Sequence, residues 1–258
     1  TFSSGELNAA LPEEVGMSSA RLKKIDKIAN DAIANGATPG CQVLVAKNGR
    51  TVYNKSFGKH TFNSSQKVQI TDLYDLASIT KVAATTITIM KLVEDGQLTL
   101  DDKMSKYLPE LVGTNKENMT IRAVLEHRAG LKSWIPFYKE TIEDEQVYDS
   151  IYASKPTDVH TIYVGNGLYI LDTYKQVIME RIYESEMGTK GKYKYSDLGM
   201  ILMKELIENV VGTDFSDFVN GAFYDPMGID RLTFLPLDKF EQSDIVPTSI
   251  SPDMRKGL

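Results

Sequence analysis

A β-hairpin with an apolar first strand limits the folds open to this chain. Two strand-like runs, residues 41–47 and 50–57, flank Asn48-Gly49, a residue pair that strongly favours a two-residue hairpin turn. The first run, Cys-Gln-Val-Leu-Val-Ala-Lys, places apolar side chains on both of its faces. Such a strand needs a packed layer on each side, and an isolated hairpin is marginally stable in water. The hairpin therefore predicts a larger sheet with covering layers.

Helical segments outnumber strands in the rest of the chain. Caps and helical periodicity predict helices over residues 19–34, 77–94, 121–127 and 198–210, with amphipathic helical stretches within residues 138–195. The run 77–94 lacks a polar face, so we expect it to be buried nearly all round. The sequence predicts only two strands, against six or more helices, so the predicted sheet has too few strands to be stable by itself. Either further strands lie within residues 232–258 or part of the sheet lies outside this chain, and we expect the second.

Composition excludes several classes of protein and site. The 258 residues carry a net charge of −6, which argues against a nucleic-acid-binding surface. No apolar run approaches the roughly 18 residues that span a bilayer. A single cysteine, Cys41, excludes an internal disulfide, and three histidines without ligand spacing predict no metal site. Because Thr1 is followed by no apolar leader segment, we expect a targeting peptide to be absent or already removed.

The pattern Ser-x-x-Lys carries catalytic chemistry and occurs three times. The pairs are Ser56/Lys59, Ser64/Lys67 and Ser78/Lys81. Residues i and i+3 face opposite sides of a strand, which separates the first pair, and the second pair lies in a polar loop. Ser78 stands where extended chain turns into a helix, so Lys81 shares its face and can reach the hydroxyl. We therefore predict that the third pair is the reactive one.

The setting of Ser78 is one that activates a serine. The positive N-terminal end of a helix favours the Ser78 alkoxide and the neutral form of Lys81, and burial lowers a lysine pKa further. A neutral lysine in contact with a serine makes an activated nucleophile. The alternative is a capping serine beside a lysine whose charged end reaches solvent.

A second element stands at another junction between loop and helix. Tyr195-Ser-Asp197 is the only Tyr-x-Asp or Tyr-x-Asn in the chain. A tyrosine there could relay a proton to a leaving group, and Asp197 could hydrogen-bond Lys81. The alternative is helix capping, because Ser and Asp are favoured caps.

Several segments, taken in order, resemble the serine β-lactamase and penicillin-binding-protein superfamily, including its class C and esterase members. They are Gly40-Cys-Gln-Val-Leu-Val-Ala, Leu76-Ala-Ser-Ile-Thr-Lys-Val82, Leu92-Val-Glu-Asp-Gly-Gln-Leu-Thr-Leu-Asp-Asp102, Thr120-Ile-Arg-Ala-Val-Leu-Glu-His-Arg-Ala-Gly-Leu131, Tyr195-Ser-Asp-Leu-Gly and Phe223-Tyr-Asp-Pro-Met-Gly228. The third motif of that family, a Lys or His followed by Ser, Thr or Ala and then Gly on a late strand, has no counterpart here.

The resemblance implies an α/β (α+β) fold with two lobes, in which an antiparallel sheet flanked by helices stands beside a mostly helical lobe. Residues 1–16 are polar and are predicted to form an N-terminal arm or linker, followed by a single domain at 17–258. Within that domain we expect the helix and first strands of the sheet lobe at 17–70. The nucleophile helix and helical lobe follow at 71–225, and the chain returns toward the sheet at 226–258.

The resemblance also implies roles for the site residues. Ser78 would be the acylated nucleophile, Lys81 its base and Tyr195 the proton relay, with Asp197 in support. Substrates would be esters or amides such as β-lactams, cell-wall peptides or simple esters, without a cofactor. A family of this kind implies a periplasmic or secreted protein.

Three further residues are candidates for substrate binding. Trp134 could line an acyl pocket, whereas tyrosines and tryptophan covering a helical lobe are the alternative. Lys192 and Lys194 could bind a substrate carboxylate at the rim of the site, whereas a solvated basic loop is the alternative.

Two departures from the family pattern reduce the expected activity. Asp197 stands where the family has Asn, and a carboxylate near Lys81 would stabilise the ammonium and oppose its action as a base. The missing third motif would normally supply one of two oxyanion-hole N–H groups, whose loss costs about 10²–10³ in rate. We therefore expect a family member that lacks its closing strands and is weak or inactive as given.

Two classes of function remain open at this level. The first is a serine acyl-hydrolase, and the second is a non-catalytic binding or accessory domain of a larger bacterial protein. The polar start of the chain suggests a fused upstream domain. An unpaired sheet edge would favour a homodimer formed by strand pairing.

Overall fold

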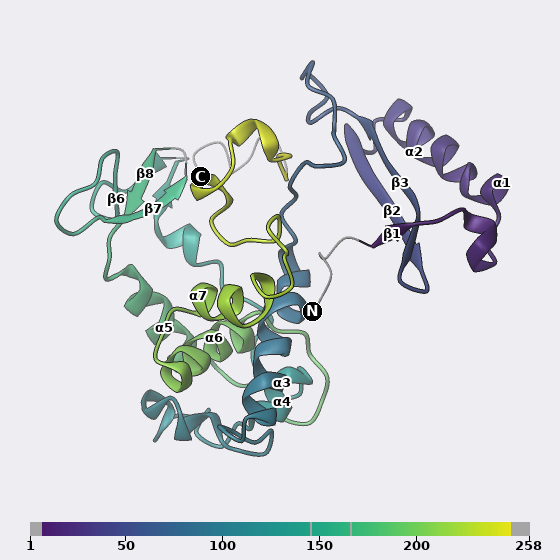
Figure 1. Ribbon diagram of the computed structural model, residues 1–258. Helices are drawn as coiled ribbons and strands as arrows, with labels where there is room; N and C mark the ends of the chain where they lie inside the picture. Colours follow the sequence, from purple (N-terminus) through teal and green to yellow (C-terminus); the bar gives the residue numbers. More distant parts are fainter. Residues whose placement is uncertain (1–6, 145, 166, 249–258) are drawn as a thin grey trace. The chain divides into compact units, whose positions relative to one another are not determined.

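The computed structural model describes residues 7–144, 146–165 and 167–248, which form two compact units (Figure 1). The first unit combines the chain up to Leu76 with the described chain from Asn220 onward, and the second consists of Ala77–Val219. A sheet organises the first unit, and a central helix organises the second.

The predicted hairpin forms most of the sheet in the first unit. Strands β2 (Gly40–Lys47) and β3 (Arg50–Gly58) pair antiparallel. Asn48 and Gly49 take the positive φ angles of 54° and 70° that the tight turn requires. A short strand β1 (Asn8–Ala9) adds to β3 in parallel, which gives the strand order β1-β3-β2.

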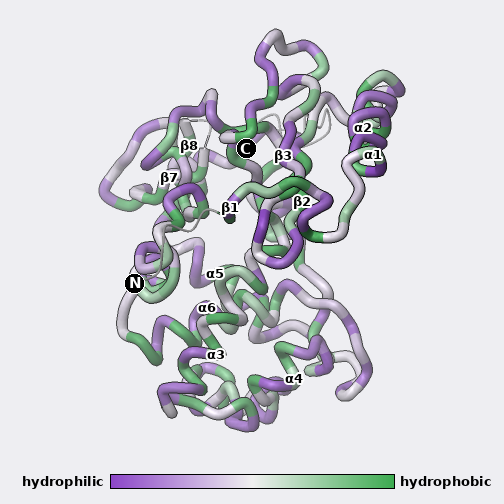
Figure 2. The backbone as a smooth tube through the Cα atoms, turned by 45° about the vertical axis from the view of Figure 1, so that its right-hand side comes forward, coloured by the Kyte–Doolittle hydropathy of each residue, from purple (hydrophilic) through white to green (hydrophobic). Residues whose placement is uncertain are grey.

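The predicted first helix is confirmed as α1 (Ser19–Leu22) followed by α2 (Lys24–Ala34), with Ser18 as the N-terminal cap. Hydrophilic and hydrophobic residues are mixed along α2 (Figure 2). Asp26 on α2 accepts hydrogen bonds from the Tyr53 hydroxyl at 2.5 Å and from Lys55 Nζ at 2.8 Å, both on β3. These contacts fix the helix on the sheet.

Part of the predicted N-terminal arm is packed on the sheet. Besides β1, a 3₁₀-helix forms at Pro12–Val15, in which Val15 is buried, and Glu14 forms an ion pair with Arg50 at 2.9 Å. Pro12 occupies the first helical turn, where a missing N–H does no harm, so it starts a helix rather than marking a linker. The first six residues of the arm lie outside the described residues.

Within the described residues, strand β2 is paired on one side only. Its partner is β3, and Leu44 is exposed although the apolar sequence predicts cover on both faces. Residues 232–248 contain two short 3₁₀-helices, Pro236–Asp238 and Gln242–Asp244. In this described segment there is no strand beyond a single bridge between Leu73 and Ile245.

Helix α6 (Leu198–Val211) is the centre of the second unit. Its buried residues are Leu198, Gly199, Leu202, Met203, Leu206 and Ile207. Helix α4 (Ile121–Leu125) packs so closely on it that a Cβ at Gly199 would lie 2.7 Å from Val124 Cγ1, so glycine is required there. The other helices of this unit are α3 (Ile87–Glu94), α5 (Tyr174–Glu184) and α7 (Phe215–Val219).

The run predicted as a helix at residues 77–94 is helical throughout but changes type along its length, and the prediction that it is buried all round is wrong. A 3₁₀ turn at Ala77–Ile79 leads into a π-helix at Lys81–Thr86 and then into α3. Val82 and Met90 are 60% and 65% exposed, so the helix is buried on one face only. The lack of a polar face in the sequence therefore did not predict that the whole helix is buried.

Residues 142–170 form small sheets instead of the predicted helical stretches. The strands are β4 (Ile142–Glu143), β5 (Gln146–Val147), β6 (Tyr152–Ala153), β7 (Ile162–Gly165) and β8 (Leu168–Ile170). They are rich in tyrosine, isoleucine and valine, which favour strands. Gly165 and Gly167 take φ angles of 104° and 73° between β7 and β8. Periodicity over such short runs does not separate the two element types.

In the described ranges, no helix is long and apolar enough to cross a membrane. The same residues hold no group of three His, Cys, Asp or Glu side chains that could bind a metal ion.

Lys116 is a fully buried ammonium group at the C-terminal end of α5. Its Nζ donates to the backbone carbonyls of Tyr183, at 3.0 Å, and Ser185, and to Asn115 Oδ1 at 2.8 Å. A cation is favourable at this end of a helix. Burial, together with the charge of Lys132, lowers the pKa of Lys116 to about 8.

We predict that the free energy of unfolding rises with pH between about 8 and the ordinary lysine value of 10.5. In that window the unfolded chain retains the Lys116 proton that the folded chain has released, so raising the pH favours folding. Lys116→Met should remove this contribution. It should also destabilise the protein by about 1–3 kcal/mol at neutral pH, because buried carbonyls lose their donor.

Urea unfolding of both proteins, below and within this pH window, measures the difference. Lys27→Met, at a lysine whose side chain is 79% exposed, is the matched control. An equal pH slope in wild type and Lys116→Met would contradict the prediction.

Candidate active site

Ser78 lies in the 3₁₀ turn at the start of the second unit, and its side chain is exposed. The residue before it, Ala77, has a φ of 43°, in the left-handed region that costs a non-glycine residue about 1–2 kcal/mol. The π-helix follows, and Thr86 Oγ1 donates to the carbonyl of Lys81 at 2.8 Å. Backbone strain and π-helical turns both concentrate at functional sites.

Lys81 contacts Ser78 as the spacing predicts. Its Nζ lies 2.9 Å from Ser78 Oγ. The other two Ser-x-x-Lys pairs show no such contact within the described residues. Ser64, for example, accepts a hydrogen bond from the backbone N–H of Gln66 instead.

Tyr195 reaches the same oxygen from a distant part of the chain. Its hydroxyl donates to Ser78 Oγ at 2.7 Å, and Lys81 Nζ lies 5.0 Å from the centre of its ring. Hydrogen bonding with Lys81, and then with Ser78, lowers the pKa of Tyr195 below its ordinary value. A positive charge beside the ring thus favours the phenolate, which can accept a proton from Ser78.

Asp197 forms an ion pair with Lys81 at 2.7 Å between Oδ1 and Nζ, without the angles of a directed hydrogen bond. Burial alone lowers the pKa of Lys81, but its contacts with Asp197 and Tyr195 together outweigh burial and raise it. The sequence led to two opposing predictions, a neutral Lys81 from the helix end and from burial, and an ammonium stabilised by Asp197. The nearby carboxylate stabilises the ammonium.

Neither Ser196 nor Asp197 caps α6 through its side chain, although both are favoured caps. Ser196 Oγ donates to the carbonyl of Lys132 at 2.6 Å, and Asp197 turns to Lys81. The side chains at this junction therefore hold the site together rather than the helix end.

The three residues predicted to bind substrate are exposed. Trp134 is 56% exposed, and the side chains of Lys192 and Lys194 are also exposed. In the described part of the chain, no hydrogen bond or ion pair joins them to Ser78 or Lys81. Their role in substrate binding stays a prediction.

His127 is a site residue that was not among the candidate residues predicted from the sequence. Its ring centre lies 4.5 Å from that of Tyr195, with the planes tilted by 43°. Its Nδ1 accepts the backbone N–H of Ser196 at 3.2 Å. The sequence placed His127 inside the predicted helix at 121–127, whereas α4 ends at Leu125 and His127 takes the left-handed position after it, where glycine is usual.

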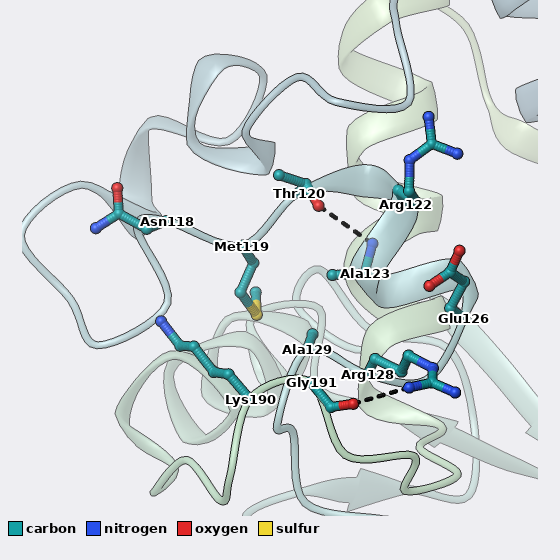
Figure 3. A pocket seen from close by; sticks show the side chains of 10 residues that line it. All are labelled: Asn118, Met119, Thr120, Arg122, Ala123, Glu126, Arg128, Ala129, Lys190 and Gly191. Atoms are coloured by element: carbon teal, nitrogen blue, oxygen red, sulfur yellow. Dashed lines mark hydrogen bonds between the residues drawn. The ribbon is translucent and has the colours of Figure 1, made fainter.

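A cavity of about 310 Å³ lies beside the turn that follows α4 (Figure 3). Its walls are Asn118, Met119, Thr120, Arg122, Ala123, Glu126, Arg128, Ala129, Lys190 and Gly191. Neither Ser78, Lys81 nor Tyr195 lines it. The dashed contact between Arg128 and the carbonyl of Gly191, at 2.9 Å, joins two segments that also carry His127 and Tyr195.

Comparisons with known proteins agree on one family. A model of the Beta-lactamase family matches residues 25–244. A relative from Escherichia coli K12, described as "Putative D-alanyl-D-alanine carboxypeptidase", is 27% identical over 266 residues. The match covers 98% of this chain and 56% of that protein, so the chain spans about half the length of the curated relatives it matches.

Solved structures show the same fold. A penicillin-binding protein homologue from Pyrococcus abyssi, described as octameric, matches with a TM-score of 0.65 and 24% identity, over 87% of this chain and 47% of that one. A class C β-lactamase matches with a TM-score of 0.60 and 20% identity, over 83% and 51%. The predicted β-lactamase/transpeptidase-like α/β fold is thereby confirmed.

We predict that Tyr195 ionises below the ordinary tyrosine pKa of 10. Among tyrosines with a resolved shift, the others are raised, and burial raises the pKa of Tyr53, Tyr74 and Tyr183 to about 12. Tyr195 should therefore give an early step in a phenolate absorbance titration. Tyr195→Phe should remove this step, and Lys81→Met should move it upward because the ammonium is lost. An early step that persists in Tyr195→Phe would show that another tyrosine is responsible.

Proposed function

Because the chain belongs to the Beta-lactamase family of serine hydrolases, we propose that Ser78 attacks the carbonyl of an ester or amide and forms an acyl-enzyme. One observation carries this proposal: Lys81 Nζ and the Tyr195 hydroxyl approach Ser78 Oγ to 2.9 and 2.7 Å. A serine held by two proton-transfer groups is the arrangement of an activated nucleophile.

The acylation step follows from the pKa directions. Tyr195, whose pKa is lowered, takes the proton of Ser78 as Oγ bonds to the carbonyl carbon. Lys81, whose pKa is raised by Asp197 and Tyr195 against burial, remains an ammonium and stabilises the phenolate. Tyr195 then returns the proton to the leaving group as the bond to that group breaks. The resemblance implied Lys81 as the base, whereas the pKa directions of Lys81 and Tyr195 favour Tyr195.

Hydrolysis completes the cycle. A water molecule attacks the acyl-Ser78 carbonyl and gives a proton to Tyr195, and the proton passes to Ser78 as the acyl bond breaks. The backbone N–H of Ser78 supplies one oxyanion donor.

The substrate class is an ester or amide with an accessible carbonyl. The E. coli relative is named for D-alanyl-D-alanine carboxypeptidase activity, which supports cell-wall peptides, and the family supports β-lactams. The exposed Ser78 leaves room for a bulky acyl group. Trp134 would pack on that group, and Lys192 and Lys194 would pair with a substrate carboxylate. A periplasmic or secreted location agrees with this substrate class.

We predict covalent labelling of Ser78 by a fluorophosphonate and by a fluorescent penicillin. Intact mass should rise by one adduct in wild type and in Ser64→Ala, a matched change in another Ser-x-x-Lys pair, and stay unchanged in Ser78→Ala. A folded wild type that takes up neither reagent would favour the alternative, a non-catalytic domain that retains the fold for binding. An adduct that persists in Ser78→Ala would contradict the site.

A further inference from the structure

We propose that His127 is a positioning residue that holds Tyr195 in place for proton transfer at Ser78. The inference rests on the proposed function and adds a residue to it. Two features of the described chain carry it: the backbone conformation of His127 and its contacts on both sides of Tyr195.

His127 occupies a helix-terminating position that suits glycine. The N–H of His127 bonds to the carbonyl of Val124 at 3.0 Å, and the N–H of Arg128 bonds to that of Ala123 at 2.7 Å. This pair of bonds defines the C-terminal motif in which the left-handed residue is usually glycine. His127 has a φ of 55° there. A residue with a large side chain at such a strained backbone position points to a function for the imidazole.

His127 fastens the backbone on both sides of Tyr195. Its carbonyl accepts the N–H of Lys194 at 2.8 Å, and its Nδ1 accepts the N–H of Ser196 at 3.2 Å. Its ring also packs against the Tyr195 ring. Two backbone hydrogen bonds and one ring contact with His127 therefore restrain the position of the Tyr195 side chain.

Neighbouring contacts hold the same two segments together at greater distance from Tyr195. The N–H of Asp197 bonds to the carbonyl of Ser133 at 2.8 Å. Arg128 and Gly191 exchange two bonds, one of which is drawn in Figure 3. Ser196 Oγ also donates to the carbonyl of Lys132 at 2.6 Å. Loss of the imidazole therefore leaves the segment attached but frees the backbone N–H of Ser196.

The bond to Ser196 requires an unprotonated Nδ1, with the proton of the neutral ring on Nε2. Burial, and then the charge of Lys81, lower the pKa of His127, while Asp197 acts in the opposite direction. The other groups near the ring are Tyr193 and Tyr195, with Glu126 and Arg128 on either side in sequence. A protonated His127 would present an N–H donor to the Ser196 N–H and lose this hydrogen bond, which we call the clasp.

Three substitutions separate the parts of this arrangement. His127→Asn keeps an acceptor and tolerates a left-handed backbone, so fluorophosphonate labelling of Ser78 should stay within about threefold of wild type. His127→Phe keeps the ring and the strain but loses the acceptor. His127→Gly loses both and relieves the strain. The last two should label about tenfold or more slowly, the equivalent of one hydrogen bond, with His127→Gly unfolding at no lower temperature.

The pH profile adds a readout that a structural role would not change. The labelling rate of wild type should fall on the acid side as His127 takes up a proton, and this fall should be absent in His127→Asn. Labelling of His127→Gly or His127→Phe at the wild-type rate would overturn the proposal. A loss of labelling that only follows loss of folding would also overturn it.

A measurement without turnover keeps this inference distinct from the proposed function. The chain has three histidines, so ¹⁵N-histidine spectra resolve each one. We expect His127 to be the Nε2–H tautomer at neutral pH, and the Ser196 amide proton to shift as His127 titrates. If wild type takes no label, the proposed function fails while this measurement still decides the clasp. An Nδ1–H tautomer, or a Ser196 amide insensitive to that titration, would overturn the inference.

Discussion

The convergence of Lys81 Nζ and the Tyr195 hydroxyl on Ser78 Oγ is the interaction on which the rest of the site depends. Lys81 reaches the serine because three residues of a helical turn bring them to one face. Tyr195 comes from the junction before α6, more than a hundred residues later. The core of the second unit therefore has to form before the site exists. The close packing of Gly199 on Val124 is one requirement for that core.

Electrostatics divides the work between the two groups on Ser78. Asp197 holds the charge of Lys81, and that charge in turn lowers the pKa of Tyr195. A lysine kept as an ammonium is a poor base but a strong stabiliser of a phenolate. In the mechanism that we propose, the aspartate in place of the family's asparagine shifts the proton-accepting role toward tyrosine. We propose that His127 supports the same arrangement through its hydrogen bond to the backbone N–H of Ser196.

Local patterns in the sequence predicted the features that depend on residues close together in the chain. Asn48-Gly49 specified the hairpin, and the spacing of Ser78 and Lys81 specified their contact. Long-range effects were predicted only in part: Asp197 was named as a partner that would stabilise the Lys81 ammonium, but the sequence could not decide between this effect and burial. The protonation of Lys81 depends on that carboxylate, 116 positions away. The short strands within residues 152–170 pair tyrosine with isoleucine, alanine and tyrosine, and these partners are set by the fold rather than by a local pattern. His127 was not predicted as a site residue, because its partner, the Ser196 N–H, lies on another segment.

The most direct test of the account is the acylation burst with an activated ester, measured in wild type and in Tyr195→Phe. The substitution removes one oxygen atom and keeps the ring that packs on His127. General acid–base catalysis contributes about 10²–10⁴ in rate, so the account predicts a burst at least about a hundredfold slower in Tyr195→Phe, with the acyl group on Ser78 in both proteins. A burst of equal rate in the two proteins would contradict the account, because the proton of Ser78 would then have another acceptor.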